Sequence, residues 1–282
     1  MPVNKLLLCT DMDRTVIPNG RQPEHPDARE NFRRLCRLSE VKLVYVTGRH
    51  QLLVKQAIAQ YELPAPDYAI TDVGTKIYQL TQGEWRELLS WQKQIATDWH
   101  GKPHGQLQQA LSCCPELALQ EQSKQNDFKL SYYLPLEADR EKILKWVEQQ
   151  LLQLGVEASL IWSIDEPEQI GLLDVLPRNA TKLHALEFLQ QLLGYEQSEI
   201  IFAGDSGNDL PVLGSPIQSI LVANAEQEIR QQALRLAKQN DCAKSLYLAQ
   251  QENFPLGGNY TAGVLQGIAF FAPEIAAKLK LS

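Results

Sequence analysis

An apolar run that ends in two aspartates constrains this chain more than any other feature. The run begins at Leu6, is bounded by polar residues, and has the length of a buried strand. Asp11 and Asp13 follow it, so in an open α/β sheet they would lie beyond the carboxyl end of a strand, where ligands bind. Two carboxylates this close repel each other unless a cation or a proton separates them. The alternative is an Asx-turn after the strand, with no chemical role.

Two more apolar runs end in polar residues that could carry chemistry. The run at 43–46 leads into a hydroxyl, a glycine and a cation, which are Thr47, Gly48 and Arg49. The run at 200–203 leads into a second pair of carboxylates, Asp205 and Asp209. Between these runs, Lys182 opens a predicted helix at 181–193. Each also has an ordinary role: the aspartates as helix-capping acids, and Lys182 as a solvated lysine.

The order of the predicted elements indicates an α/β protein with an inserted domain. Strands alternate with helices near 27–38 and 54–61, which predicts a Rossmann-like parallel sheet with helices on both faces. From about Gln82 the pattern changes to period-two strands around a helix stripe, typical of an α+β module. We expect a core domain at 1–81 and 177–282 and an α+β domain at 82–176, with a loop at 257–263 before a final helix.

Composition excludes several classes of function. The net charge of −7 comes without a basic stripe, which argues against nucleic acid as a partner. No apolar stretch approaches the roughly 20 residues of a membrane span, and the N-terminus lacks the layout of a signal peptide. The five cysteines are odd in number and show no CxxC spacing, so we expect reduced thiols and a cytoplasmic location.

Taken in order, these four motifs resemble those of the haloacid-dehalogenase superfamily. The resemblance implies a phosphatase in which Asp11 attacks phosphorus and forms an aspartyl-phosphate. It also implies Mg²⁺, held by Asp11, the backbone carbonyl of Asp13 and Asp205, while Asp209 orients metal waters or anchors Lys182. The inserted domain resembles the α/β cap of the superfamily members that act on phosphorylated sugars.

The resemblance also assigns roles to the remaining motif residues. Asp13 would protonate the leaving oxygen and then deprotonate the attacking water, which an ester substrate requires. Thr47 and Lys182 would bind the phosphoryl oxygens. Arg49 would bind phosphate or sugar, or else pair with a surface acid. The resemblance also implies that Gly48 and Asn208, in the same motifs, bind the substrate.

Within the superfamily, most of the chain resembles the sucrose-phosphate phosphatases. Segments such as Lys129-Leu130-Ser131-Tyr132-Tyr133 carry the likeness, and Lys129 and Ser131 are expected to bind sugar unless this strand face is merely solvated. The implied reaction is the Mg²⁺-dependent hydrolysis of sucrose 6-phosphate, with a sugar-phosphate synthase as an associated protein. Mannosylfructose, glucosylglycerate and trehalose phosphates are alternative substrates, and a non-catalytic phosphosugar-binding partner of a glycosyltransferase is an alternative role. Arg14 departs from the pattern, because asparagine is common there.

Overall fold

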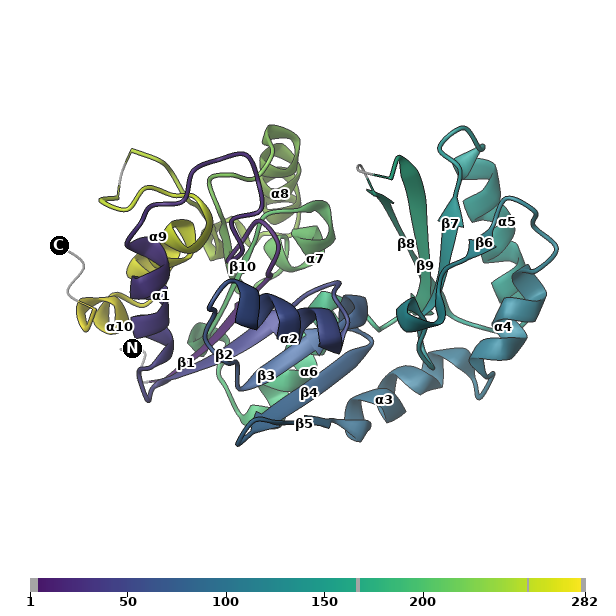
Figure 1. The fold of residues 1–282 in the computed structure, drawn as a ribbon, viewed down its shortest axis with the longest axis horizontal. Helices are drawn as coiled ribbons and strands as arrows, with labels where there is room; N and C mark the ends of the chain where they lie inside the picture. The colour runs from purple at the N-terminus through teal and green to yellow at the C-terminus, as the bar shows by residue number, and fades with distance from the viewer. Residues whose placement is uncertain (1–4, 166–167, 253, 280–282) are drawn as a thin grey trace. The chain divides into compact units, whose positions relative to one another are not determined.

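The computed structural model describes residues 5–165, 168–252 and 254–279, and the chain divides into two compact units (Figure 1). The first unit combines Met1–Glu87 with Ala185–Ser282, and the second is Leu88–His184. Each unit has its own sheet and its own hydrophobic cluster.

The first unit is built on a sheet that has eight strands in the described part of the chain, in the order β12-β11-β10-β1-β2-β3-β4-β5. The strands from β12 to β3 are parallel, and β4 and β5 are added antiparallel. The strand bounds are β1 Leu6–Thr10, β2 Val41–Val46, β3 Tyr68–Thr71, β4 Lys76–Thr81, β5 Glu84–Glu87, β10 Ile200–Gly204, β11 Gln218–Leu221 and β12 Leu246–Leu248. The parallel core predicted from the apolar runs is therefore present.

Helices cover both faces of this sheet. Leu6 and Leu8 of β1 pack into one cluster with apolar residues of α1, α2 and α9, while Leu7 and Cys9 point to the other face and are also fully buried. Figure 1 shows α6 on the side of the sheet away from α2. The helix bounds are α1 Ala28–Cys36, α2 Gln51–Gln60, α6 Lys182–Leu193, α7 Leu210–Leu213, α8 Gln227–Gln239, α9 Tyr260–Phe271 and α10 Pro273–Ala277.

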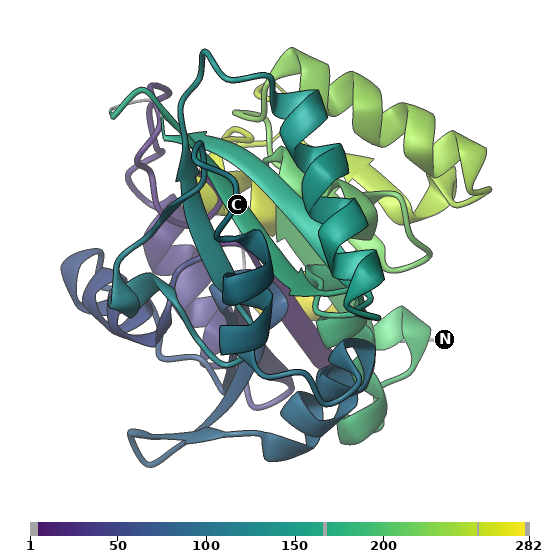
Figure 2. The same cartoon turned by 90° about the vertical axis from the view of Figure 1, so that its right-hand side faces the viewer.

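The second unit is an antiparallel sheet with helices on one face, in the strand order β6-β7-β9-β8. Apolar residues of β7 and β9 form a single cluster with those of α4 and α5, and Figures 1 and 2 show both helices on the same side of the sheet. The element bounds are α3 Leu89–Ile95, α4 His104–Leu111, β6 Ala118–Leu119, β7 Leu130–Leu134, α5 Arg140–Gln153, β8 Ala158–Asp165 and β9 Ile170–Pro177.

Two local details differ from what the sequence indicated. Strand β5 continues the first sheet, so that sheet extends beyond Gln82, where the inserted domain was expected to begin. Helix α9 begins at Tyr260, inside the predicted loop at 257–263. Its Gly263 lies so close to the chain before it that an added Cβ would be 2.2 Å from the Gly258 carbonyl oxygen. The glycine there permits close packing of a helix rather than a turn.

The helices in the described ranges are all too short or too polar to cross a lipid bilayer.

Candidate active site

The candidate site lies at the carboxyl ends of three neighbouring parallel strands. Strand β1 pairs with β10 on one side and with β2 on the other. Asp11, Asp205 and Thr47 are the residues that follow these three strands. A hydrogen bond from the Asp11 N–H to the Ala203 carbonyl, 2.8 Å long, extends the β1–β10 pairing to this point. The parallel arrangement therefore brings residues far apart in the sequence to one edge of the sheet.

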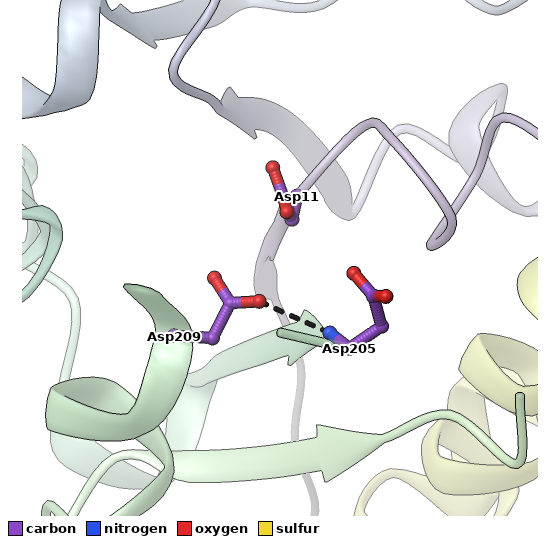
Figure 3. A group of neighbouring side chains, drawn as sticks. All are labelled: Asp11, Asp205 and Asp209. Carbon is purple, nitrogen blue, oxygen red and sulfur yellow. Dashed lines mark hydrogen bonds between the residues drawn. The ribbon is translucent and has the colours of Figure 1, made fainter. Parts of the chain in front are cut away.

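Three buried carboxylates meet at this edge. Asp11, Asp205 and Asp209 each offer an oxygen, and these oxygens all lie within 4.8 Å of one another (Figure 3). The side chains are 5%, 3% and 0% exposed, so water screens their mutual repulsion weakly. Three buried carboxylates fit a hard divalent cation, because oxygen is the ligand that Mg²⁺ prefers. This cluster forms from the aspartates that the sequence identified at two different strand ends.

Asp209 also shapes the loop that presents Asp205. Its Oδ2 atom accepts hydrogen bonds from the N–H groups of Asp205 and Ser206, at 3.0 and 3.1 Å. Gly204 makes this contact possible, because a Cβ at that position would lie 2.5 Å from Asp209 Oδ2. The helix-capping role considered for Asp209 is therefore present, and it is combined with a place in the carboxylate cluster.

Asp13 is held by a two-pronged ion pair. Arg49 donates from Nε and from Nη2 to the two carboxylate oxygens of Asp13, each at 2.7 Å, and Asn19 Nδ2 donates to Oδ1 at 2.8 Å. The bonds to Asp13 hold the pKa of the Arg49 guanidinium above its usual value. Of the two partners expected for Arg49, the structure shows an acid, and that acid is Asp13 itself.

A strained turn supports the segment with Thr47 and Arg49. Asp72 and Val73, just after β3, both have positive φ values of 51° and 60°. Their N–H groups bond to the carbonyls of Arg49 and Thr47, at 3.0 and 3.3 Å. A β-branched residue such as Val73 rarely adopts this conformation, so the turn costs free energy and is maintained by its surroundings. Thr47 itself is buried, and its Oγ1 accepts the N–H of Arg49 at 3.2 Å.

Three predicted substrate-binding residues remain to be described. Gly48 and Asn208 are exposed, next to Arg49 and Asp209 respectively. Lys182 is buried and is the first residue of α6, at the end of the second unit. The predicted contacts of these three residues with a substrate stay predictions.

Lys129 and Ser131 meet a carboxylate inside the second unit. Lys129 Nζ lies 3.3 Å from Asp174 Oδ1, and Ser131 Oγ donates to the same atom at 2.5 Å. Lys129 and Ser131 are both buried, whereas Tyr133 of the same strand is half-buried. Sugar binding by Lys129 and Ser131 stays a prediction, and any sugar there would also meet Asp174.

Two asparagines of the candidate site were missed from the sequence. Asn19 bonds to the side chain of Asp13 and accepts the N–H of Arg14, and Asn224 Nδ2 donates to the Arg14 carbonyl at 2.6 Å. Asn19 is followed by Gly20, a turn signal that could have placed it in the loop after Asp13. Nothing in the sequence around Asn224 marks it.

The chain is similar in sequence and in fold to known proteins. Residues 4–272 match the family described as sucrose-6F-phosphate phosphohydrolase. A haloacid-dehalogenase-like hydrolase of Nitrosococcus oceani is 49% identical over 273 residues, which cover 97% of this chain and 73% of that protein. Sucrose-phosphatase 1 of Nicotiana tabacum is 27% identical over 95% of this chain, which spans only 59% of the tobacco protein. The X-ray structure of the sucrose-phosphatase of Synechocystis sp. with sucrose and phosphate superposes with a TM-score of 0.72, at 25% identity, over 96% of this chain and 98% of that one.

The 49% identical relative shows that the chain is a member of the haloacid-dehalogenase superfamily, and the parallel sheet, the strand-end carboxylates and the α+β unit agree with this. The relatives place it among the phosphoric monoester hydrolases of that superfamily. The chain belongs to the sucrose-6F-phosphate phosphohydrolase family.

Proposed function

We propose that this protein is a Mg²⁺-dependent phosphatase that hydrolyses sucrose 6-phosphate to sucrose and phosphate through an aspartyl-phosphate on Asp11. The observation that carries the proposal is the meeting of Asp11, Asp205 and Asp209 at one edge of the sheet, with Asp13 two residues after Asp11. The family to which the chain belongs supports the substrate.

Asp11 would act as the nucleophile. Its Oδ1 accepts the Met12 N–H at 2.8 Å, which fixes the orientation of the carboxylate at the strand end. A carboxylate oxygen attacks phosphorus, the bond from phosphorus to the sugar oxygen breaks, and the phosphoryl group is transferred to Asp11. Water then attacks the phosphorus of this acyl phosphate, phosphate leaves, and the Asp11 carboxylate is restored.

Asp13 would move the protons in both steps. It would give a proton to the departing sugar oxygen and then take one from the attacking water. Its pairing with Arg49 favours the ionised carboxylate, which suits the second step. A phosphate dianion can also accept two hydrogen bonds from the Arg49 guanidinium. If Arg49 exchanged Asp13 for the substrate phosphate, Asp13 would be able to carry the proton needed in the first step.

The carboxylate cluster fits Mg²⁺. Asp11, Asp205 and the backbone carbonyl of Asp13 would hold the ion, and Asp209 would orient its waters or anchor Lys182. When bound, Mg²⁺ offsets the negative charge of the nucleophile and of the phosphate. We also propose, from the motif resemblance, that Thr47 and Lys182 bind the phosphoryl oxygens.

We propose that the sugar of the substrate is sucrose. The sucrose-phosphatase of Synechocystis sp. is in complex with sucrose and phosphate in its X-ray structure, which supports sucrose 6-phosphate for this chain. We propose that the second unit, with Lys129, Ser131 and Asp174, contributes to recognition of the sugar. Substrates of related shape, namely mannosylfructose, glucosylglycerate and trehalose phosphates, are the competing candidates.

Release of phosphate from a panel of sugar phosphates tests the proposal, with Mg²⁺ and then with EDTA. The expected result is release that requires Mg²⁺ and is fastest with sucrose 6-phosphate. Faster release from another glycosyl phosphate would keep the mechanism and refute the sugar. A protein that binds these esters and hydrolyses none of them would be the non-catalytic partner of a glycosyltransferase instead.

A further inference from the structure

Arg14 occupies an unfavourable backbone conformation beside the carboxylate cluster. Its φ is 55°, in the left-handed region that costs an arginine roughly 1–2 kcal/mol. Hydrogen bonds at both ends of the residue maintain this conformation: the Arg14 N–H donates to Asn19 Oδ1 at 2.8 Å, and the carbonyl accepts from Asn224 Nδ2. Asparagine adopts this conformation more readily, so the backbone alone does not favour arginine here.

The guanidinium of Arg14 is directed at Asp205. Arg14 Nε lies 3.2 Å from Asp205 Oδ2, and the buried Nε finds no acceptor in hydrogen-bonding geometry among the described residues, so the contact is an ion pair. The other end of the group is fixed as well, with Nη1 3.2 Å from Glu226 Oε1 and Nη2 donating to the Asn224 carbonyl at 3.3 Å. The side chain is therefore held over the carboxylate by contacts on both sides.

We infer that Arg14 is a built-in counter-ion of the metal site: it offsets the repulsion among Asp11, Asp205 and Asp209 when no metal is bound, and it lowers the affinity of the site for a divalent cation. The inference rests on the proposed metal site and goes beyond it, because Arg14 is assigned to none of the catalytic steps.

The charges support this role. Arginine keeps its positive charge at every physiological pH, so it is always available to the cluster. A divalent cation that binds Asp205 must approach this guanidinium, and two cations held by one buried carboxylate repel each other. The same residue therefore stabilises the metal-free site and competes with the metal.

Metal binding measured directly tests the inference. Mn²⁺ and Mg²⁺ are titrated into protein stripped with EDTA, with free Mn²⁺ followed by electron paramagnetic resonance and Mg²⁺ by calorimetry. For Arg14→Gln we expect tighter binding by roughly three- to tenfold, and a melting temperature without metal that is lower by a few degrees. Arg14→Lys keeps the charge and should return both quantities toward those of the wild type.

Two controls keep the result interpretable. Arg86→Gln removes the same charge from an exposed position on β5 and should leave metal affinity unchanged. Arg14→Asn is a second neutral variant that suits the left-handed backbone, so it should fold even if the glutamine variant does not. It too should bind metal more tightly than the wild type.

Equal or weaker metal binding in both neutral variants would overturn the inference; weaker binding would mean that Arg14 orients Asp205 for the metal instead of competing with it. Wild-type protein that binds neither Mn²⁺ nor Mg²⁺ would refute the metal site itself. The proposed function would then fail, whatever the role of Arg14.

Discussion

At the scale of single residues, the negative charge of each clustered carboxylate is offset by a different contact. Asp209 accepts two backbone N–H groups, Asp205 faces Arg14 and accepts the Thr15 hydroxyl at 3.4 Å, and Asp11 accepts the Met12 N–H. The three oxygens nevertheless lie within 4.8 Å of one another. Loss of one negative charge should therefore stabilise the metal-free protein, even where it abolishes activity.

The substitution Asp11→Asn tests whether stability without metal rises while activity is lost. The amide oxygen can still accept the Met12 N–H, so the local geometry is kept while the nucleophile is lost. We expect phosphate release to fall by about 10³-fold or more, as for the loss of other nucleophiles that act within a catalytic unit. We expect the melting temperature in EDTA to rise by about 2–4 °C, the shift that 1 kcal/mol gives in a protein of this size range.

Asp127→Asn, which neutralises an exposed carboxylate of the second unit, is the matched control and should change neither quantity. An Asp11→Asn protein that kept its turnover would exclude the aspartyl-phosphate.

The cysteines differ in reactivity for reasons of burial. Cys9 lies in β1 and is fully buried, and burial raises the pKa of its thiol well above the usual value. Cys113 is exposed. Because only the thiolate reacts, an aromatic disulfide reagent should label Cys113 in the native protein and Cys9 only after unfolding.

Cys9 should stay unlabelled in the folded protein even at pH 9, because burial raises the pKa of its thiol and keeps it protonated. Mass spectrometry of the labelled peptides checks this, and Cys113→Ser removes the fast phase. Rapid labelling of Cys9 in the folded protein would show that β1 is accessible, contrary to its place in the core.

At the scale of elements, the end of β10 depends on a close approach that glycine permits. Gly204→Ala would place a Cβ 2.5 Å from Asp209 Oδ2 and 2.6 Å from Asp209 Cγ. The aspartate must move, and its bonds to the Asp205 and Ser206 N–H groups would be lost. We expect destabilisation of about 1–3 kcal/mol and weaker Mg²⁺ binding, from urea unfolding and calorimetry.

Gly207→Ala is the control for this substitution within the same loop. The nearest atom to its Cβ would be Ile229 Cδ1 at 3.7 Å, an ordinary contact. Its stability and metal affinity should match those of the wild type. Equal effects of the two substitutions would mean that the loop responds to any added methyl group, and not to displacement of Asp209.

The sequence revealed the strands of the parallel core because continuous apolar runs mark strands that are buried on both faces, as in Leu6–Thr10. It did not reveal β5, because three of the four residues of Glu84–Glu87 are charged and the strand is partly exposed. The resemblance of the motifs implied that Asp11 and Asp205 share one metal site, and the parallel strands do bring the two side chains to one edge of the sheet. The pairing of Arg49 with Asp13 could not be derived, because it joins side chains 36 residues apart whose directions depend on the turns around them.

At the scale of the whole molecule, each unit has the components of an independent domain. The second unit buries its own cluster, in which Leu130, Leu173 and Val147 are fully buried. Its strands pair only with one another in the described part of the chain. Because its sheet and its apolar cluster are its own, the second unit should hold its structure by itself.

We therefore expect residues 88–184, produced alone, to fold. The fragment should show a cooperative urea transition and dispersed amide resonances, because its sheet and helices enclose one continuous apolar core. Leu173→Ala should lower its stability by about 2–5 kcal/mol, since it leaves a cavity where the side chain is fully buried. Leu152→Ala, at an exposed position of α5, should have little effect. A fragment without a cooperative transition would show that the second unit depends on the first for its fold.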